Sequence, residues 1–184
     1  MATDLTALDL AIALSLAGST QKGLDLSTPQ DTLNLSKSLA LAFGTGAGKA
    51  DQVFHDRRIL AGSGSEDLDL AGVLTNAYGG AVTFAKVKAI IVLNRSDETL
   101  TTPVAHTATD AEVAVGGAAA NEFQGPFQAA GDAIGIPAGG IFVIACNDAN
   151  GWAVTAGTGD LLKIENLDAV DEACFDIVVI GESA

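Results

Sequence analysis

The residues of this chain best suited to acid–base chemistry are its two histidines, which lie far apart in the sequence. His55 precedes Asp56 and two arginines, and His106 lies in a polar segment. A His–Asp pair serves a hydrolase when a serine stands in a Gly-x-Ser-x-Gly turn between a strand and a helix. In the nearby stretch 62–65, Gly-Ser-Gly-Ser, the glycines are in the wrong register for that turn. We therefore expect residues 56–58 to form an exposed ion-pair cluster or an interface, and His106 to be solvated.

The loop at residues 44–50, Gly-Thr-Gly-Ala-Gly-Lys-Ala, resembles a phosphate-binding loop at first sight. Such a loop needs four residues between its first glycine and a Gly-Lys pair, followed by Ser or Thr to hold magnesium. Here Phe43 stands where the first glycine should be, and Ala50 replaces the hydroxyl residue. A dinucleotide-binding fingerprint fails as well, because Lys49 occupies its last glycine position. The loop is therefore expected to be a flexible linker.

Metal ligands are sparse in this sequence. Two separated histidines without a neighbouring pair of thiols do not make a zinc site. Residues 147–151, Asn-Asp-Ala-Asn-Gly, match half of a calcium loop, but the glutamate that must close such a loop is missing. The Asn-Gly pair favours a tight hairpin turn instead. The acidic pairs at 97–98 and 171–172 are expected to be solvated loop charges, with a weak cation site at a subunit interface as the alternative.

These observations predict no catalytic residue, no metal and no cofactor, and therefore a protein that is not an enzyme. Trp152, the only tryptophan, is expected to anchor the core or its rim. The N-terminus lacks the basic segment of a secretion signal. We accordingly expect Cys146 and Cys174 to be buried, reduced thiols, with a cross-strand disulfide as the alternative.

The charge balance restricts the possible partners. Nine basic residues against 23 acidic ones give a formal net charge of −14. Nucleic acids and anionic membrane surfaces are bound through clustered Lys and Arg side chains. We therefore expect neither a nucleic acid nor a membrane as a partner.

Alternation of apolar and polar residues, the period of a β-strand, dominates the chain. It runs over residues 8–16 and again over 33–43, and eight or nine shorter strand candidates follow from about residue 50 onward. Short strands between closely spaced turns are typical of a β-sandwich or jelly roll. We predict an all-β fold, with a β-sandwich or jelly-roll-like domain over residues 46–184 and an N-terminal β-strand arm over residues 1–45.

Two details of the larger domain can also be predicted. The apolar run at 82–93 changes phase, which indicates a β-bulge near Ala85–Lys86. The polar segment 94–111 contains Pro103 and is expected to be an exposed loop.

The two long strands of the arm are too small to fold alone. They either join the main sheet or pair with another chain. If they pair with another chain, we expect the partner-binding stripe to consist of Leu8, Leu10, Ile12 and Leu14.

Five segments between residues 54 and 181 resemble a family of small virion-associated proteins of tailed bacteriophages. They are Phe54-His-Asp-Arg-Arg-Ile-Leu-Ala-Gly-Ser-Gly-Ser-Glu-Asp-Leu-Asp-Leu-Ala-Gly-Val-Leu, Val82-Thr-Phe-Ala-Lys-Val-Lys-Ala-Ile, Val115-Gly-Gly-Ala-Ala-Ala-Asn, Val154-Thr-Ala-Gly-Thr-Gly-Asp-Leu-Leu-Lys-Ile and Asp176-Ile-Val-Val-Ile-Gly. These motifs consist of turns and core strands and contain no active site. The resemblance implies a structural component of a phage particle.

Together, the resemblance, the small size, the acidity and the arm lead us to expect a capsid decoration or cement protein. Such a protein would lie on the virion surface, bind between subunits of the major capsid protein, and associate with itself as a trimer or another homo-oligomer. The alternative is a tail or fibre module that binds a glycan of the host surface through an exposed aromatic platform.

Overall fold

The computed structural model describes residues 9–72 and 74–183 and is essentially all-β, which confirms the predicted fold class. In chain order, its strands are β1 (Asp9–Gln21), β2 (Gln30–Phe43), β3 (Lys49–Ala50), β4 (Gln52–Leu60), β5 (Ser65–Asp69), β6 (Leu74–Thr75), β7 (Ala81–Val82), β8 (Lys86–Asn94), β9 (Val113–Gly116), β10 (Ala133–Ile136), β11 (Ile141–Ala145), β12 (Trp152–Ala153), β13 (Leu161–Asn166) and β14 (Ala173–Glu182). A 3-10 turn, Gly125–Phe127, lies between β9 and β10. The described part of the chain has no helix with the length and hydropathy needed to span a membrane.

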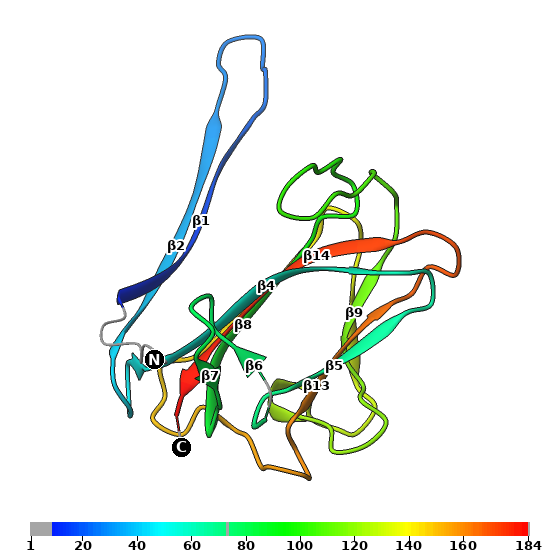
Figure 1. Cartoon of the computed structure of the whole chain (residues 1–184). Coiled ribbons are helices and arrows are strands. Elements are labelled where there is room, and N and C mark those ends of the chain that lie inside the picture. Colours follow the sequence, from blue (N-terminus) through cyan, green and yellow to red (C-terminus); the bar gives the residue numbers. More distant parts are fainter. Residues whose placement is uncertain (1–8, 73, 184) are drawn as a thin grey trace.

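Two antiparallel sheets pack together to form the body of the molecule, which we define as residues 44–72 and 74–183 (Figure 1). One sheet has the strand order β10-β9-β13-β5, and the other has the order β11-β8-β14-β4 with β12 added beside β8. Side chains from both sheets fill the space between them, including Phe54, Ile90, Val115, Ile164 and Phe175. This arrangement agrees with a β-sandwich, while the more specific jelly-roll expectation stays a prediction.

Alternation along the strands determines which residues reach this core. In β13, Leu162 and Ile164 are fully buried, whereas the alternate residues Leu161, Lys163 and Glu165 are half-buried. In β14, Phe175, Ile177 and Val179 point into the core, so the intervening residues lie on the outer face of the five-stranded sheet.

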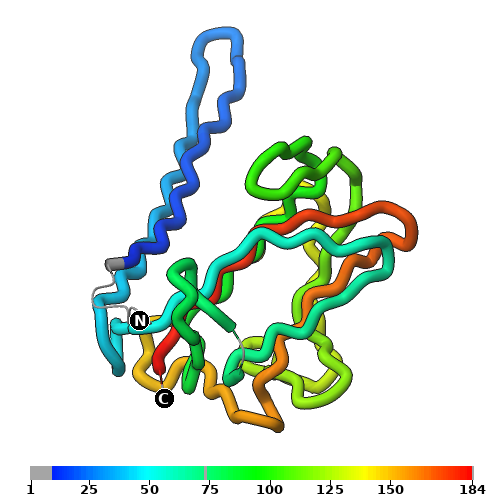
Figure 2. The backbone as a smooth tube through the Cα atoms, in the orientation of Figure 1, coloured from blue at the N-terminus to red at the C-terminus, as the bar shows by residue number. Residues whose placement is uncertain are grey.

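An arm formed by β1 and β2 extends away from the body, as the tube in Figure 2 shows. The two strands pair antiparallel over 13 residue pairs, from Asp9–Ala42 to Gln21–Gln30, with no register shift. Residues 22–29, which include Pro29, connect them at the tip. At the other end, Ala42 and Phe43 pair in parallel with β3, which leads directly into the body.

The predicted bulge exists, but its predicted position was wrong by about two residues. In the ladder between β14 and β8, Ile180 lies opposite Ala89, whereas Gly181 lies opposite Val87. Lys88 is therefore the extra residue, and the phase of β8 changes there rather than at Ala85–Lys86. A bulge at Lys88 directs its side chain toward Glu182 at the end of β14.

Candidate functional site

The arm is the strongest candidate for a functional surface, because its two faces differ in chemistry. Residues directly opposite each other in an antiparallel pair share a face. One face carries the pairs Leu10–Leu41, Ile12–Leu39, Leu14–Lys37 and Leu16–Leu35, followed by Leu33 opposite Gly18. The other face carries Ala11–Ala40, Ala13–Ser38, Ser15–Ser36 and Ala17–Asn34. The ribbon is therefore apolar on one side and small or polar on the other.

The inner part of the apolar face packs against the body. We call this part the arm root, and it consists of Leu10, Ile12, Leu39 and Leu41. Leu41 is 1% exposed, and the other three side chains are partly buried. They contact outward-facing residues of the five-stranded sheet, among them Ala89, Ala145, Val178 and Ile180.

The outer part of the same face has no partner within the described residues. We call its four side chains the arm leucines: Leu14, Leu16, Leu33 and Leu35. Their exposed fractions are 60%, 50%, 56% and 52% respectively. Soluble monomers rarely expose a continuous row of leucines, because contact of apolar side chains with water is unfavourable. Such a row on a projecting ribbon is typical of a contact surface.

The residues of the predicted partner-binding stripe thus lie in different environments. Leu14 is exposed, as a contact residue should be. Leu10 and Ile12, by contrast, pack on the chain's own body. Leu8 lies outside the described residues. Leu16 was left out, although the strand period places it on the face of Leu14. Leu33 and Leu35 were missed because only the pairing register places them on that face.

The glycine-rich loop at 44–48 connects the arm to the body and is held by hydrogen bonds, so it is not the flexible linker that we expected. The amide of Gly46 donates to Oε1 of Glu182 at 2.8 Å, and the amide of Gly48 donates to the carbonyl oxygen of Asn147 at 2.9 Å. Gly46 has a φ of 104° and Gly48 a φ of 66°, which disfavour residues with a side chain. The glycines therefore allow a fixed turn.

A buried ion pair lies directly beneath this turn. Nζ of Lys88 is 2.9 Å from Oε1 of Glu182, and the two side chains are 0% and 4% exposed. Lys88 also donates to the carbonyl oxygen of Asp148. Burial raises the pKa of Glu182, but hydrogen bonds from Lys88 and from the Gly46 amide outweigh it, so the net pKa lies below its usual value. The carboxylate is therefore charged at neutral pH and fixes the loop at the foot of the arm.

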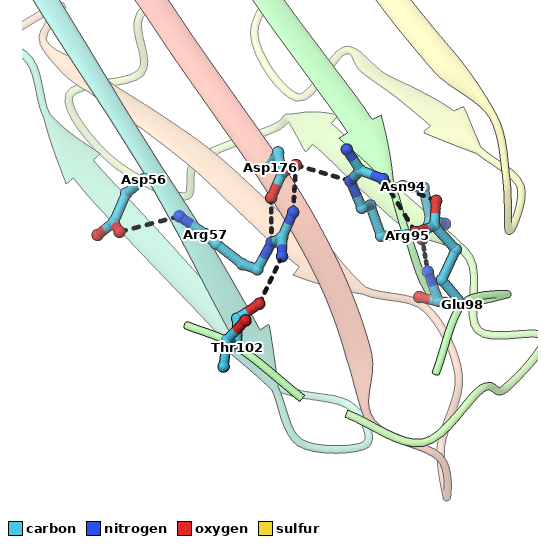
Figure 3. Close-up of polar contacts among 8 residues, drawn as sticks. Asp56, Arg57, Asn94, Arg95, Glu98, Thr102 and Asp176 are labelled. Carbon is cyan, nitrogen blue, oxygen red and sulfur yellow. Dashed lines mark hydrogen bonds and ion pairs between the residues drawn. The ribbon is translucent and has the colours of Figure 1, made fainter. Parts of the chain in front are cut away.

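A second polar network lies on the outer face of the five-stranded sheet, away from the arm root. Figure 3 shows Arg57 of β4 and Arg95, just after β8, converging on Asp176 of β14. Arg57 uses Nε and Nη2, at 2.5 and 2.8 Å, to bind both carboxylate oxygens. Arg95 adds a contact of 2.7 Å through Nε, and its Nη1 binds Glu98.

These contacts change the acidity of the groups involved. The hydrogen bond from Arg57 is the main reason that the pKa of Asp176 lies below its usual value, and Arg95 acts in the same direction. The pKa values of both arginines are raised, chiefly by their hydrogen bonds to Asp176. A carboxylate neutralised by two arginines is fully paired, so this network supports structure and provides no free acid or base.

The predicted ion-pair cluster at 56–58 is present but more extended than expected. Nε of Arg58 binds Asp56 at 2.7 Å, and its Nη1 binds Glu66 of β5. Arg57 belongs to the network around Asp176 instead. His55 is exposed on the neighbouring strand position.

The prediction for His106 was wrong, because its side chain is buried. Nδ1 lies 3.2 Å from Oε1 of Glu172, and Nε2 lies 3.2 Å from the carbonyl oxygen of Ser96. The segment 94–111 is a loop, as expected, but it folds back so that His106 pairs with Leu100 and fills its interior. The histidine therefore holds the loop to the start of β14.

The expected hairpin at 147–151 is also wrong. Strands β11 and β12, which flank this segment, both pair antiparallel with β8. The segment therefore interrupts one edge strand of the sheet, and β11 and β12 are the two stretches of that strand. Trp152, which follows it, is half-buried and packs against the core, in agreement with the predicted anchor.

Three aspartates form a small acidic cluster on the body. Ligand oxygens of Asp110, Asp168 and Asp171 lie within 4.8 Å of one another. Hydrogen bonds from the Asp171 and Val170 amides lower the pKa of Asp168, as expected for a carboxylate that closes its own turn. This geometry accounts for the position of Asp168 within the cluster.

The two cysteines are free and do not form a disulfide with each other. Cys174 is buried, as expected, and burial raises the pKa of its thiol. Cys146 is only partly buried.

Comparison of the chain with protein-family models, curated proteins and solved structures found no match.

Proposed function

We propose that this chain is a structural protein of a tailed-phage virion, in which it decorates the capsid and cements neighbouring major capsid subunits. The observation that carries the proposal is the arm: a 13-pair ribbon outside the body, with four half-exposed leucines on one face. A protein that acts through contact needs such a surface, whereas a self-contained binding domain or enzyme does not.

The arm suits a partner that is itself rich in β-structure. Its strand β1 has one edge without a strand neighbour among the described residues, so a strand of the partner can add to it. The arm leucines can then cover an apolar surface next to that edge. Each contact of this kind is modest, but many copies on one lattice increase the total binding through multivalency.

The polar groups of the body favour a structural role over a catalytic one. His106 holds a loop, Asp176 is neutralised by two arginines, and Glu182 fixes the foot of the arm. These groups explain the shape of the molecule, and each has a partner that limits its availability for chemistry.

Cryo-electron microscopy of purified virions from the source tests the proposal. We expect density for this chain on the icosahedral lattice, at junctions between capsid subunits, with the arm against a neighbouring molecule. Density only at the tail would overturn the proposal in favour of the glycan-binding module. Titration of host polysaccharide, followed by Trp152 fluorescence, would then test that module directly. Absence of the chain from the particle would overturn any virion role.

A further inference from the structure

The outer face of the five-stranded sheet is only partly covered by the arm root. Strand pairing places outward-facing residues in rows across the sheet. The row Val53–Ile180–Ala89–Ala145 lies beneath the arm root. The next two rows are His55–Val178–Ile91–Val143 and Arg57–Asp176–Leu93–Ile141.

These two rows leave an apolar patch open on the side of β11. Ile141 is 69% exposed and Val143 is 47% exposed. Ile91 and Leu93 beside them are half-buried. We call these four residues the sheet patch. The patch continues the surface that the arm root covers, with the same aliphatic chemistry.

The arm leucines likewise continue the arm root along the ribbon. The root shows what this face of the ribbon contacts: aliphatic side chains on the outer face of the five-stranded sheet. Within one molecule the arm diverges from the sheet (Figure 1). The arm leucines stay exposed, and so do Ile141 and Val143 of the sheet patch. One chain therefore presents two aliphatic surfaces, the arm leucines and the sheet patch, that do not contact each other within the molecule.

We propose that the arm leucines of one copy pack on the sheet patch of a second copy. The arm root already packs on the sheet of its own molecule. In the proposed contact, the arm leucines pack on the sheet of another molecule in the same way. It concerns self-association alone and holds whether or not the protein binds a capsid.

The distribution of charge favours this arrangement over contact between two bodies. Residues 1–45 contain four acidic and two basic side chains, whereas residues 46–184 contain nineteen and seven. A nearly neutral arm approaches an acidic body with little repulsion, while two bodies repel each other. Lys37, which lies opposite Leu14 on the apolar face, adds an attractive charge.

The area is also sufficient. The outer part of the arm, residues 14–21 with 30–37, is a strip about 25 Å long and about 10 Å wide, given the rise per residue and the strand spacing. One docked arm then buries about 500 Å² on the two partners together. Two reciprocal arms bury about 1,000 Å², which is near the lower limit for a specific interface.

Cysteine cross-linking of mixed copies tests the proposal directly. One population carries Leu35→Cys and an affinity tag, and the other carries Val143→Cys without the tag. Both carry Cys146→Ser, so that the remaining native thiol is the buried Cys174. After mixing and mild oxidation, we expect tagged–untagged dimers at least about tenfold in excess over either homodimer. The matched control places the cysteine at Ser36, the next residue of the same strand but on the opposite face.

Sedimentation equilibrium of the full chain provides the second measurement. Val143→Asp is expected to raise the dissociation constant for self-association at least about tenfold, with unchanged Trp152 fluorescence as evidence of folding. Homodimers of the Leu35→Cys population as the main product would indicate stacked arms and overturn the proposal. Equal cross-linking from Ser36→Cys, or a monomer at every concentration, would overturn it as well.

Discussion

Replacement of Glu182 by Gln tests whether the buried ion pair holds the foot of the arm. The substitution keeps the shape of the side chain and removes its charge, so that the ammonium of Lys88, 0% exposed, loses its carboxylate at 2.9 Å. Breaking a buried pair by removing one partner costs about 3–5 kcal/mol, because the other charge stays buried and uncompensated. The carbonyl oxygen of Asp148 still accepts from Lys88, so we expect the lower value, about 3 kcal/mol.

Urea unfolding followed by Trp152 fluorescence is the assay. Trp152 lies opposite Val87, the residue before Lys88, and therefore reports on this region. With an m-value of about 2–3 kcal/mol/M, a loss of about 3 kcal/mol lowers the midpoint by about 1 M or slightly more. The matched control is Glu165→Gln, which breaks a surface pair with Lys163 and should cost less than about 1 kcal/mol.

Two further measurements separate the charge effect from a loss of packing. The double variant Lys88→Met with Glu182→Gln should recover at least about 1 kcal/mol of the summed single losses. The folded pKa of Glu182 is lowered, so its contribution is complete above the usual value of 4.5 and is lost as the pH falls through the folded value. The difference between wild type and Glu182→Gln should therefore shrink in acid. A cost for Glu182→Gln no larger than that for Glu165→Gln would refute the reasoning.

Three other predictions concern the body and the arm. Asp176→Asn should flatten the loss of stability in acid. The folded pKa of Asp176 is lowered, so its contribution is complete above the usual value of 3.8 and is lost as the pH falls further, through the folded pKa. Unfolding free energies from pH 7 down to the acid limit of the folded state measure this. Gly181→Ala should cost about 1–3 kcal/mol in urea unfolding, since its new Cβ would meet backbone, whereas Gly18→Ala on the open arm should cost nothing. A disulfide reagent should titrate Cys146 in the native protein and reach Cys174 only in denaturant, and rapid reaction of both thiols would contradict the burial of Cys174.

Local alternation was sufficient to predict the strands but not their partners. The period of two located β1 and β2 in the sequence. Apolar runs located β8 and β14, which are largely buried on both faces. The apparent hairpin at 147–151 failed for a different reason. An Asn-Gly turn signal says nothing about which strand lies beside its flanks, and here β8 lies beside both of them.

The polar sites depended on contacts between residues distant in sequence, so the sequence alone did not reveal them. Arg57 and Asp176 are 119 residues apart and meet only because β4 and β14 pair in one register. His106 looked solvated because its neighbours are polar, yet Glu172, 66 residues later, provides a partner for its ring. The leucines of β1 and those of β2 come to share one face only through the register of the two strands.

The unpaired edges of the arm have a consequence for the behaviour of the protein in solution. Within the described residues, β1 has a strand neighbour on one side only, and β2 meets β3 through just two residues. Long free edges of this kind favour open-ended, fibre-like growth when they meet in solution. Repulsion between acidic bodies opposes such meetings, and its range falls from about 8 Å at 0.15 M ionic strength to about 3 Å at 1 M. We therefore expect the protein to stay dispersed at low ionic strength and to polymerise in concentrated salt.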